Sequence, residues 1–173
     1  MALDPAKLEI VHYPAAVLRA KAKPLAAVTD EVRAVAFRML DLMHEAPGVG
    51  LAAPQVGLSW RLFVANHTGQ PADDLVFINP VLSAPSRLTE DYEEGCLSLP
   101  EIRALIRRPM EITVTALGLD GQPFTLTSDE LPARIWQHEI DHLDGVLILD
   151  RMSPGDRTAL RRKIKELEDD AKS

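Results

Sequence analysis

The stretch from Pro132 to Gly145, PARIWQHEIDHLDG, decides how this chain is interpreted. Ser128-Asp129 offers an N-cap ahead of it, Pro132 suits the first turn of a helix, and Asp144-Gly145 supplies a stop. The sequence therefore predicts a helix from about Pro132 to Leu143.

Within this helix, the run His138-Glu139-Ile140-Asp141-His142 places two imidazoles at i and i+4. Side chains at this spacing lie on one helix face, where both rings can reach one metal ion. Glu139 lies about 100° around the helix from His138, close enough to handle the proton of a water held by that ion. The pattern favours a metal-dependent hydrolase.

Two histidines leave a catalytic metal site one protein ligand short, so the third ligand decides the class of enzyme. One metalloprotease pattern takes a later histidine where this chain has Ile148. A second pattern takes a glutamate from a later helix, and Glu166 is the candidate, although its charged neighbours are typical of a solvated face. The remaining candidate is Cys96, because a thiolate with two imidazoles leaves one position open for water.

Cys96 lies in Glu94-Gly95-Cys96-Leu97-Ser98-Leu99-Pro100, where glycine permits close backbone approach and we expect the proline to end the local structure. It is the only cysteine, so the chain forms no intramolecular disulfide.

A third segment, GVGLAAPQVG from Gly48 to Gly57, carries so little side-chain bulk that backbones pack closely there or a ligand's main chain lies against it. It lacks the Lys-Ser/Thr end of a phosphate-binding loop. Gln55 in this segment is a candidate hydrogen-bond donor to a developing oxyanion.

Outward from these segments, the chain alternates between helical and strand-like patterns. Thr29–Glu45 has the apolar spacing of a helix with one buried stripe, ended by Pro47-Gly48. Residues from about 153 to 170 predict a surface helix with Leu160, Ile164 and Leu167 on its narrow apolar side.

The predicted strands, in a region read as antiparallel hairpins, are Arg61–Ala65, Leu75–Asn79, Ile112–Leu117, Pro123–Thr127 and the strand-like Val146–Leu149. We expect an α+β class: antiparallel strands around a central metal-binding helix, in one domain over residues 1–173.

Composition excludes several classes of protein. With 46% apolar and 26% charged residues, the 173-residue chain is typical of a globular protein rather than a disordered one. The 19 Lys and Arg against 26 Asp and Glu give a net charge of −7, which argues against a broad nucleic-acid surface. No apolar run approaches the roughly 20 residues that span a bilayer, so we expect no membrane segment. The cytoplasm is the default compartment, with an organelle as the alternative if a transit peptide was removed.

Taken together, the three segments Gly48–Gln55, Glu94–Ser98 and His138–His142 resemble, in order, the three signature motifs of peptide deformylases. The resemblance covers nearly the whole chain and is closest to the bacterial and organellar type 1 form. One departure is Ala15-Ala16, where related sequences commonly have an Asp-Pro pair.

The resemblance implies that Cys96, His138 and His142 hold one divalent metal, natively Fe(II), with Zn, Ni or Co as substitutes. It implies hydrolysis of the N-formyl group from the initiator methionine of nascent polypeptides, with Glu139 as general base and acid. Gln55 and the backbone N–H of Leu97 would stabilise the oxyanion.

The resemblance also assigns substrate contacts, in which the peptide lies extended against Val49, Gly50 and Gly95, with Arg103 nearby. The role of Arg134 stays open: its stem could line the methionine pocket while its head reaches water. In this family the C-terminal helix is associated with ribosome docking, for which the basic residues here are Arg157, Arg161, Arg162, Lys163 and Lys165.

Two alternatives remain from the residues themselves. One is a zinc-dependent peptidase that uses His138, His142 and a different third ligand. The other is a non-enzymatic module stabilised by metal, although structural zinc sites usually have four protein ligands and only three are found here.

Overall fold

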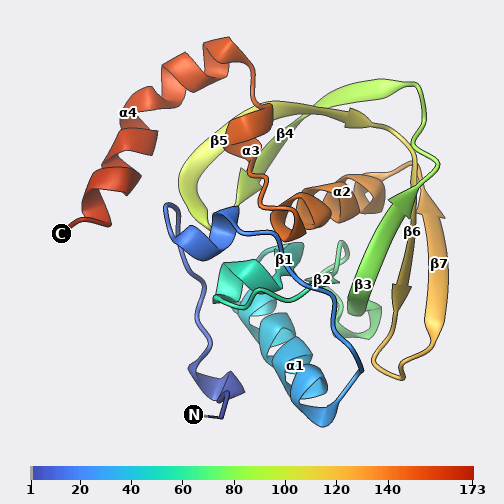
Figure 1. The fold of residues 1–173 in the computed structure, drawn as a ribbon. Helices are drawn as coiled ribbons and strands as arrows, with labels where there is room; N and C mark the ends of the chain where they lie inside the picture. The colour runs from blue at the N-terminus through green and yellow to red at the C-terminus, as the bar shows by residue number, and fades with distance from the viewer. Residues whose placement is uncertain (1) are drawn as a thin grey trace.

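The computed structural model describes Ala2–Ser173; Met1, where the expected domain begins, lies outside the described residues. The helices are α1 (Asp30–Glu45), α2 (Leu131–Leu143), α3 (Ile148–Arg151) and α4 (Pro154–Asp170). The strands are β1 (Gly50–Ala52), β2 (Leu62–Ala65), β3 (Leu75–Ser83), β4 (Thr89–Cys96), β5 (Leu99–Pro109), β6 (Ile112–Leu117) and β7 (Pro123–Ser128). The predicted α+β class, with antiparallel strands around a central helix, is confirmed (Figure 1).

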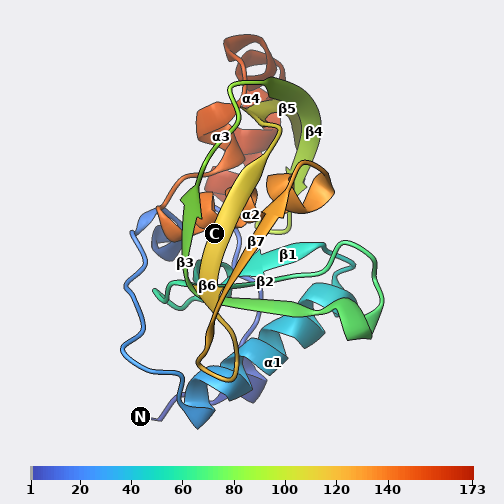
Figure 2. The ribbon, with the colours of Figure 1, turned by 90° about the vertical axis from the view of Figure 1, so that its right-hand side faces the viewer.

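Five strands form one antiparallel sheet in the order β1-β2-β3-β6-β7, and β4 pairs with β5 in a separate hairpin. Helix α1 lies below this sheet and the hairpin arches over α2 on the other side (Figures 1 and 2). Strand β1 is at the edge of the sheet and pairs only with β2, so its outer backbone edge is open to a further strand.

Strand β2 is buried on both faces because helices cover both sides of the sheet. Its alternate residues Leu62 and Val64 pack in the same apolar cluster as the buried stripe of α1. Phe63 belongs instead to the cluster that contains Trp136 of α2, and its ring stacks on Phe77 with centroids 4.4 Å apart. The two apolar clusters therefore fix the sheet between α1 and α2.

Helix α2 is buried along most of its length, and only Leu131, Pro132 and His138 of its residues are outside the buried class. Trp136, Ile140 and Leu143 pack toward the five-stranded sheet. The remaining buried positions include charged side chains such as Glu139 and Asp141, and buried charges must find partners.

Several sequence-based predictions of local structure were wrong. Val146–Leu149 is not a strand; Ile148 instead begins the short helix α3, because a short apolar run does not distinguish a buried strand from a buried helix. The N-cap of α2 is Glu130, whereas Ser128 accepts a hydrogen bond from the Glu130 backbone N–H. Pro100 does not end the local structure but lies inside β5.

In the segment after Tyr13-Pro14, Ala16–Arg19 makes one turn of 3-10 helix. Within residues 2–173, no helix combines the length and apolar character needed to cross a membrane.

A glycine after α2 provides a test of the packing between this helix and the N-terminal segment. Gly145 has φ +74°, and an added Cβ would lie 2.5 Å from the carbonyl oxygen of Arg19. Gly121 has a similar φ of +76° but open space around it. We expect Gly121→Ala to lower the free energy of unfolding by about 1 kcal/mol, from backbone strain alone. Gly145→Ala should lower it by about 2–4 kcal/mol, since a steric clash adds to the strain.

Urea denaturation of both variants checks this prediction. Equal losses of stability would show that Arg19 moves away without cost, and the proposed packing constraint would be rejected.

Candidate metal centre

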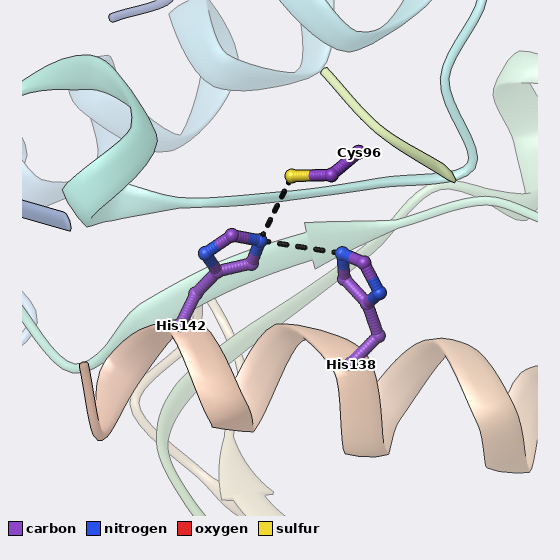
Figure 3. Close-up of side chains that lie close together, drawn as sticks. All are labelled: Cys96, His138 and His142. Atoms are coloured by element: carbon purple, nitrogen blue, oxygen red, sulfur yellow. Dashed lines mark hydrogen bonds between the residues drawn. The ribbon is translucent and has the colours of Figure 1, made fainter. Parts of the chain in front are cut away.

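Three metal-ligating side chains from two separate elements come together beside α2. His138 and His142 extend from one face of the helix toward Cys96 at the end of β4 (Figure 3). The ring Nε2 atoms of the two histidines are 3.2 Å apart, and Cys96 Sγ lies 3.3 Å from Nε2 of His142. The donor atoms of all three residues lie within 4.8 Å of one another.

The chemistry of this donor set fits a divalent transition metal. A thiolate and two imidazoles suit ions such as zinc or iron, and three protein ligands leave a further position open. His138 Nδ1 is bound to Glu94 Oε1 at 2.8 Å, which leaves Nε2 of the same ring to face the cluster. Burial lowers the pKa of His142 well below its usual value, and a neutral ring is the form that ligates metal.

Glu139 lies next to this cluster and lines the same cleft as Cys96 and His138. Its side chain is buried, and Oε2 has no hydrogen-bond partner within the described residues. Burial raises the pKa of Glu139 to about 7. Strand β1 passes so close that a Cβ added at Gly50 would lie 2.5 Å from Oε1 of Glu139. Only glycine permits this approach.

Gln55 is fixed so that its amide nitrogen faces the cluster. Its Oε1 accepts a hydrogen bond from the Ala52 backbone N–H at 2.9 Å. Its Nε2 lies 3.2 Å from Ser98 Oγ and 3.6 Å from Cys96 Sγ. These contacts fix both ends of the buried amide.

A buried set of ion pairs connects the two elements that carry the ligands. Arg108 of β5 makes two hydrogen bonds to Glu94, at 2.7 and 2.9 Å, and a third to Asp141 at 2.8 Å. Burial opposes the charged form of Glu94. Hydrogen bonds from His138 and Arg108 nevertheless hold the pKa of Glu94 well below its ordinary value. Arg151 also contacts Asp141, at 2.7 Å. These contacts fix the position of β4 relative to α2.

Arg134, whose role the sequence leaves open, does not extend its head group into bulk water. The side chain is buried, and its Nη1 donates to Glu94 Oε2 at 2.7 Å. Glu94 becomes a neighbour of Arg134 only through tertiary packing, so the spacing along α2 could not reveal the pair.

A cleft of about 540 Å³ is lined by Cys96 and His138 of the cluster and by the four residues predicted to contact substrate. Val49 and Gly50 come from the segment at the open edge of β1, and Gly95 lies opposite Arg103 in the β4–β5 hairpin. Arg103 is exposed and pairs with Glu93 at 2.7 Å. Leu97, which follows Cys96 at the turn of the hairpin, also lines the cleft.

Glu166, the rival third ligand, does not join the cluster. It lies on α4, with its side chain more than half exposed, and pairs with Arg162 at 3.0 Å. The group of donor atoms that could hold a metal contains Cys96 instead.

Sequence reasoning assigned no role to four residues around the cluster, namely Glu94, Ser98, Arg108 and Asp141. One signal for Arg108 was available: Ile102, Ala104 and Ile106 alternate along β5 as inward-facing residues, and the same period places Arg108 inward. A buried arginine requires carboxylate partners.

Comparisons with known proteins agree with this geometry. The family model described as Polypeptide deformylase matches residues 7–158. The chain is 41% identical over 162 residues to the peptide deformylase of Acinetobacter baumannii (strain SDF), covering 94% of this chain and 92% of that protein. It is 39% identical over 163 residues to peptide deformylase 1B, chloroplastic/mitochondrial, of Arabidopsis thaliana, covering 93% of this chain and 60% of that longer protein.

The fold agrees as well. A crystal structure of peptide deformylase from Plasmodium falciparum superimposes with a TM-score of 0.92 at 34% identity, covering 95% of this chain and 97% of that one. The chain therefore belongs to the polypeptide deformylase family of enzymes.

Proposed function

We propose that this enzyme hydrolyses the N-formyl group from the initiator methionine of nascent polypeptides and releases formate. One observation carries the proposal: in a member of this family, Glu139 and Gln55 line the same cleft as Cys96 and His138, whose donor atoms cluster with that of His142. Residues 1–173 would act as a single catalytic domain.

The cluster would hold one divalent ion, Fe(II) in the native enzyme, with Zn, Ni or Co as substitutes. When bound, this ion would supply Lewis acidity, which lowers the pKa of water and polarises a carbonyl. The donor set supports this role, because a catalytic site has three protein ligands and an open position.

Glu139 would move the proton in both halves of the reaction. Its free Oε2 lies beside the cluster, where it can take a proton from the attacking water. The same carboxyl group would then deliver this proton to the leaving amine. The buried position of Glu139 excludes bulk water that would compete for the proton.

Gln55 and the Leu97 backbone N–H would bind the oxyanion that forms on the formyl group. Gln55 suits this role because the Ala52 N–H and Ser98 Oγ hold both ends of its amide. A donor whose position is set before the reaction needs no reorganisation as charge develops.

The peptide would lie extended along the open edge of β1, between Val49 and Gly50 on one side and Gly95 on the other. Strand addition at a free edge uses main-chain hydrogen bonds, so the enzyme would tolerate many sequences. Arg103, exposed in the same cleft, would contact the peptide beyond the first residue.

The enzyme would work where nascent chains are made, in the bacterial cytoplasm or in an organelle. The basic residues of α4 would contact the ribosome. Two of them are internally paired, Arg162 with Glu166 and Lys165 with Asp169, whereas Arg161 makes no ion pair within residues 2–173.

Glu139→Gln tests the proposed proton transfer. We expect the variant to lower kcat/KM for a formyl-Met tripeptide by at least about 100-fold, because the amide cannot accept the proton. Formate release and peptide mass, followed under anaerobic conditions, check this expectation. Glu9→Gln, an exposed change far along the chain, serves as the matched control. Cleavage of a peptide bond in place of formate release would instead support the peptidase alternative.

Metal content tests the proposed ligands. Protein purified without oxygen should carry about one iron ion per chain. Cys96→Ser should lose most of this metal and the activity with it, because a neutral hydroxyl is a much poorer ligand than a thiolate. Glu166→Gln should retain both. Elemental analysis after dialysis measures these values, and metal retained in Cys96→Ser would refute the ligand assignment.

Ribosome co-sedimentation tests the role of α4. Arg161→Glu combined with Arg162→Glu should weaken co-sedimentation at low salt, since the substitutions place negative charge where the anionic ribosome would bind. The matched control is Lys21→Glu combined with Arg87→Glu. This double variant changes the net charge by the same amount, at exposed sites outside α4. Equal binding by the two double variants would count against docking through α4.

A further inference from the structure

The cleft continues from the metal-binding cluster toward the beginning of α2. Residues at positions i, i+3, i+4 and i+7 of this helix share one face, and Tyr92 and Glu94 of β4 line the same cavity. The helix residues of this arm are Leu131, Arg134, Ile135 and His138. If the reacting group lies at the cluster, as proposed above, the first side chain of the substrate enters this arm.

The Arg134 guanidinium forms one wall of the arm and is held rigidly. Its Nη1 donates to Glu94 Oε2 at 2.7 Å and to the carbonyl of Ile106 at 2.9 Å, and its Nη2 donates to the carbonyl of Glu90 at 2.8 Å. The ring of Tyr92 lies 5.3 Å from Arg134 Cζ. Four neighbouring groups therefore fix the orientation of this head group.

These contacts do not use all the donors of Arg134. A guanidinium has five N–H groups. Three are used by Glu94, Ile106 and Glu90, so Nε–H and one N–H of Nη2 have no acceptor within residues 2–173. Nε is not among the fully buried polar atoms without a partner, so it keeps some exposed surface, and Arg134 itself lines the cleft.

From these unused donors we infer that Arg134 is a specificity-determining residue, and that the cleft accepts formylated chains whose first residue is methionine sulfoxide. The inference rests on the proposed function and extends its substrate class. The extended substrate class comprises first residues with linear, neutral side chains that carry a hydrogen-bond acceptor near the position of the methionine sulfur.

The chemistry of the wall supports this class. A sulfoxide oxygen is polar, and an apolar pocket would bury it without a hydrogen bond. Here Arg134 supplies charged N–H donors, and a hydrogen bond to a charged group changes binding by about 10- to 100-fold. Methionine itself needs no hydrogen-bond donor from the pocket, because its thioether packs on aliphatic and aromatic surfaces.

A competition assay tests the inference. Formyl-Met-Ala-Ser and formyl-Met(O)-Ala-Ser are mixed with one enzyme, and both products are followed by mass. The ratio of initial rates gives the ratio of kcat/KM values. Any loss of metal or of total activity cancels in this ratio, since both peptides meet the same enzyme.

We expect the native enzyme to prefer the thioether by less than about 10-fold, and Arg134→Met to raise this preference by at least about 10-fold. Arg134→Lys, which keeps a charge but offers fewer fixed donors, should give an intermediate ratio. The matched control is Arg107→Met, because Arg107 lies outside the cleft and pairs with Asp91 on the exposed face of the hairpin. Its ratio should equal that of the native enzyme.

A second readout does not depend on turnover. Calorimetric titration of both formyl peptides into Glu139→Gln protein should give dissociation constants with the same dependence on Arg134. An unchanged ratio in Arg134→Met, or a native preference for the thioether above about 10-fold, overturns the inference while leaving deformylation intact. Failure of the native enzyme to act on formyl-Met-Ala-Ser overturns the proposed function and this inference together.

Discussion

Arg108 joins two parts of the chain that must keep a fixed distance for the site to exist. It bonds Glu94 on the strand that ends at Cys96, and Asp141 on the helix that carries both histidines. All three side chains are buried, where a charge without a partner is costly. The ion pairs are therefore satisfied in only one arrangement of strand and helix, and that arrangement brings the thiol and the imidazoles together.

The same helix also serves the core, and this double role explains its unusual burial. Trp136, Ile140 and Leu143 pack against the sheet, while the opposite side of the helix faces the cleft. Because the apolar side is fixed by the stacked Phe63 and Phe77 beneath it, the polar side cannot rotate. The hydrophobic core thus orients side chains that are not part of it.

Local patterns in the sequence predicted much of the fold but few of its long-range contacts. The helices Thr29–Glu45 and Pro132–Leu143 follow from apolar spacing and caps, which are local properties. Strand β4 gave no such signal, because five of its eight residues are exposed and four are acidic, and its pairing with β5 supplies the order. The three motifs indicated the metal cluster. The partners of Arg134 and Arg108 come from distant segments, so only the folded chain reveals them.

The order of the ligands along the chain has a consequence for how the enzyme matures. Cys96 leaves the ribosome well before His138 and His142, and Arg151, which steadies Asp141, comes later still. The domain folds as a unit only after these C-terminal segments are available. During synthesis the thiol is therefore without its partners, open to oxidants and to competing ions. If the cluster binds a metal ion, as proposed above, binding through all three ligands can be completed only after α2 has been synthesised.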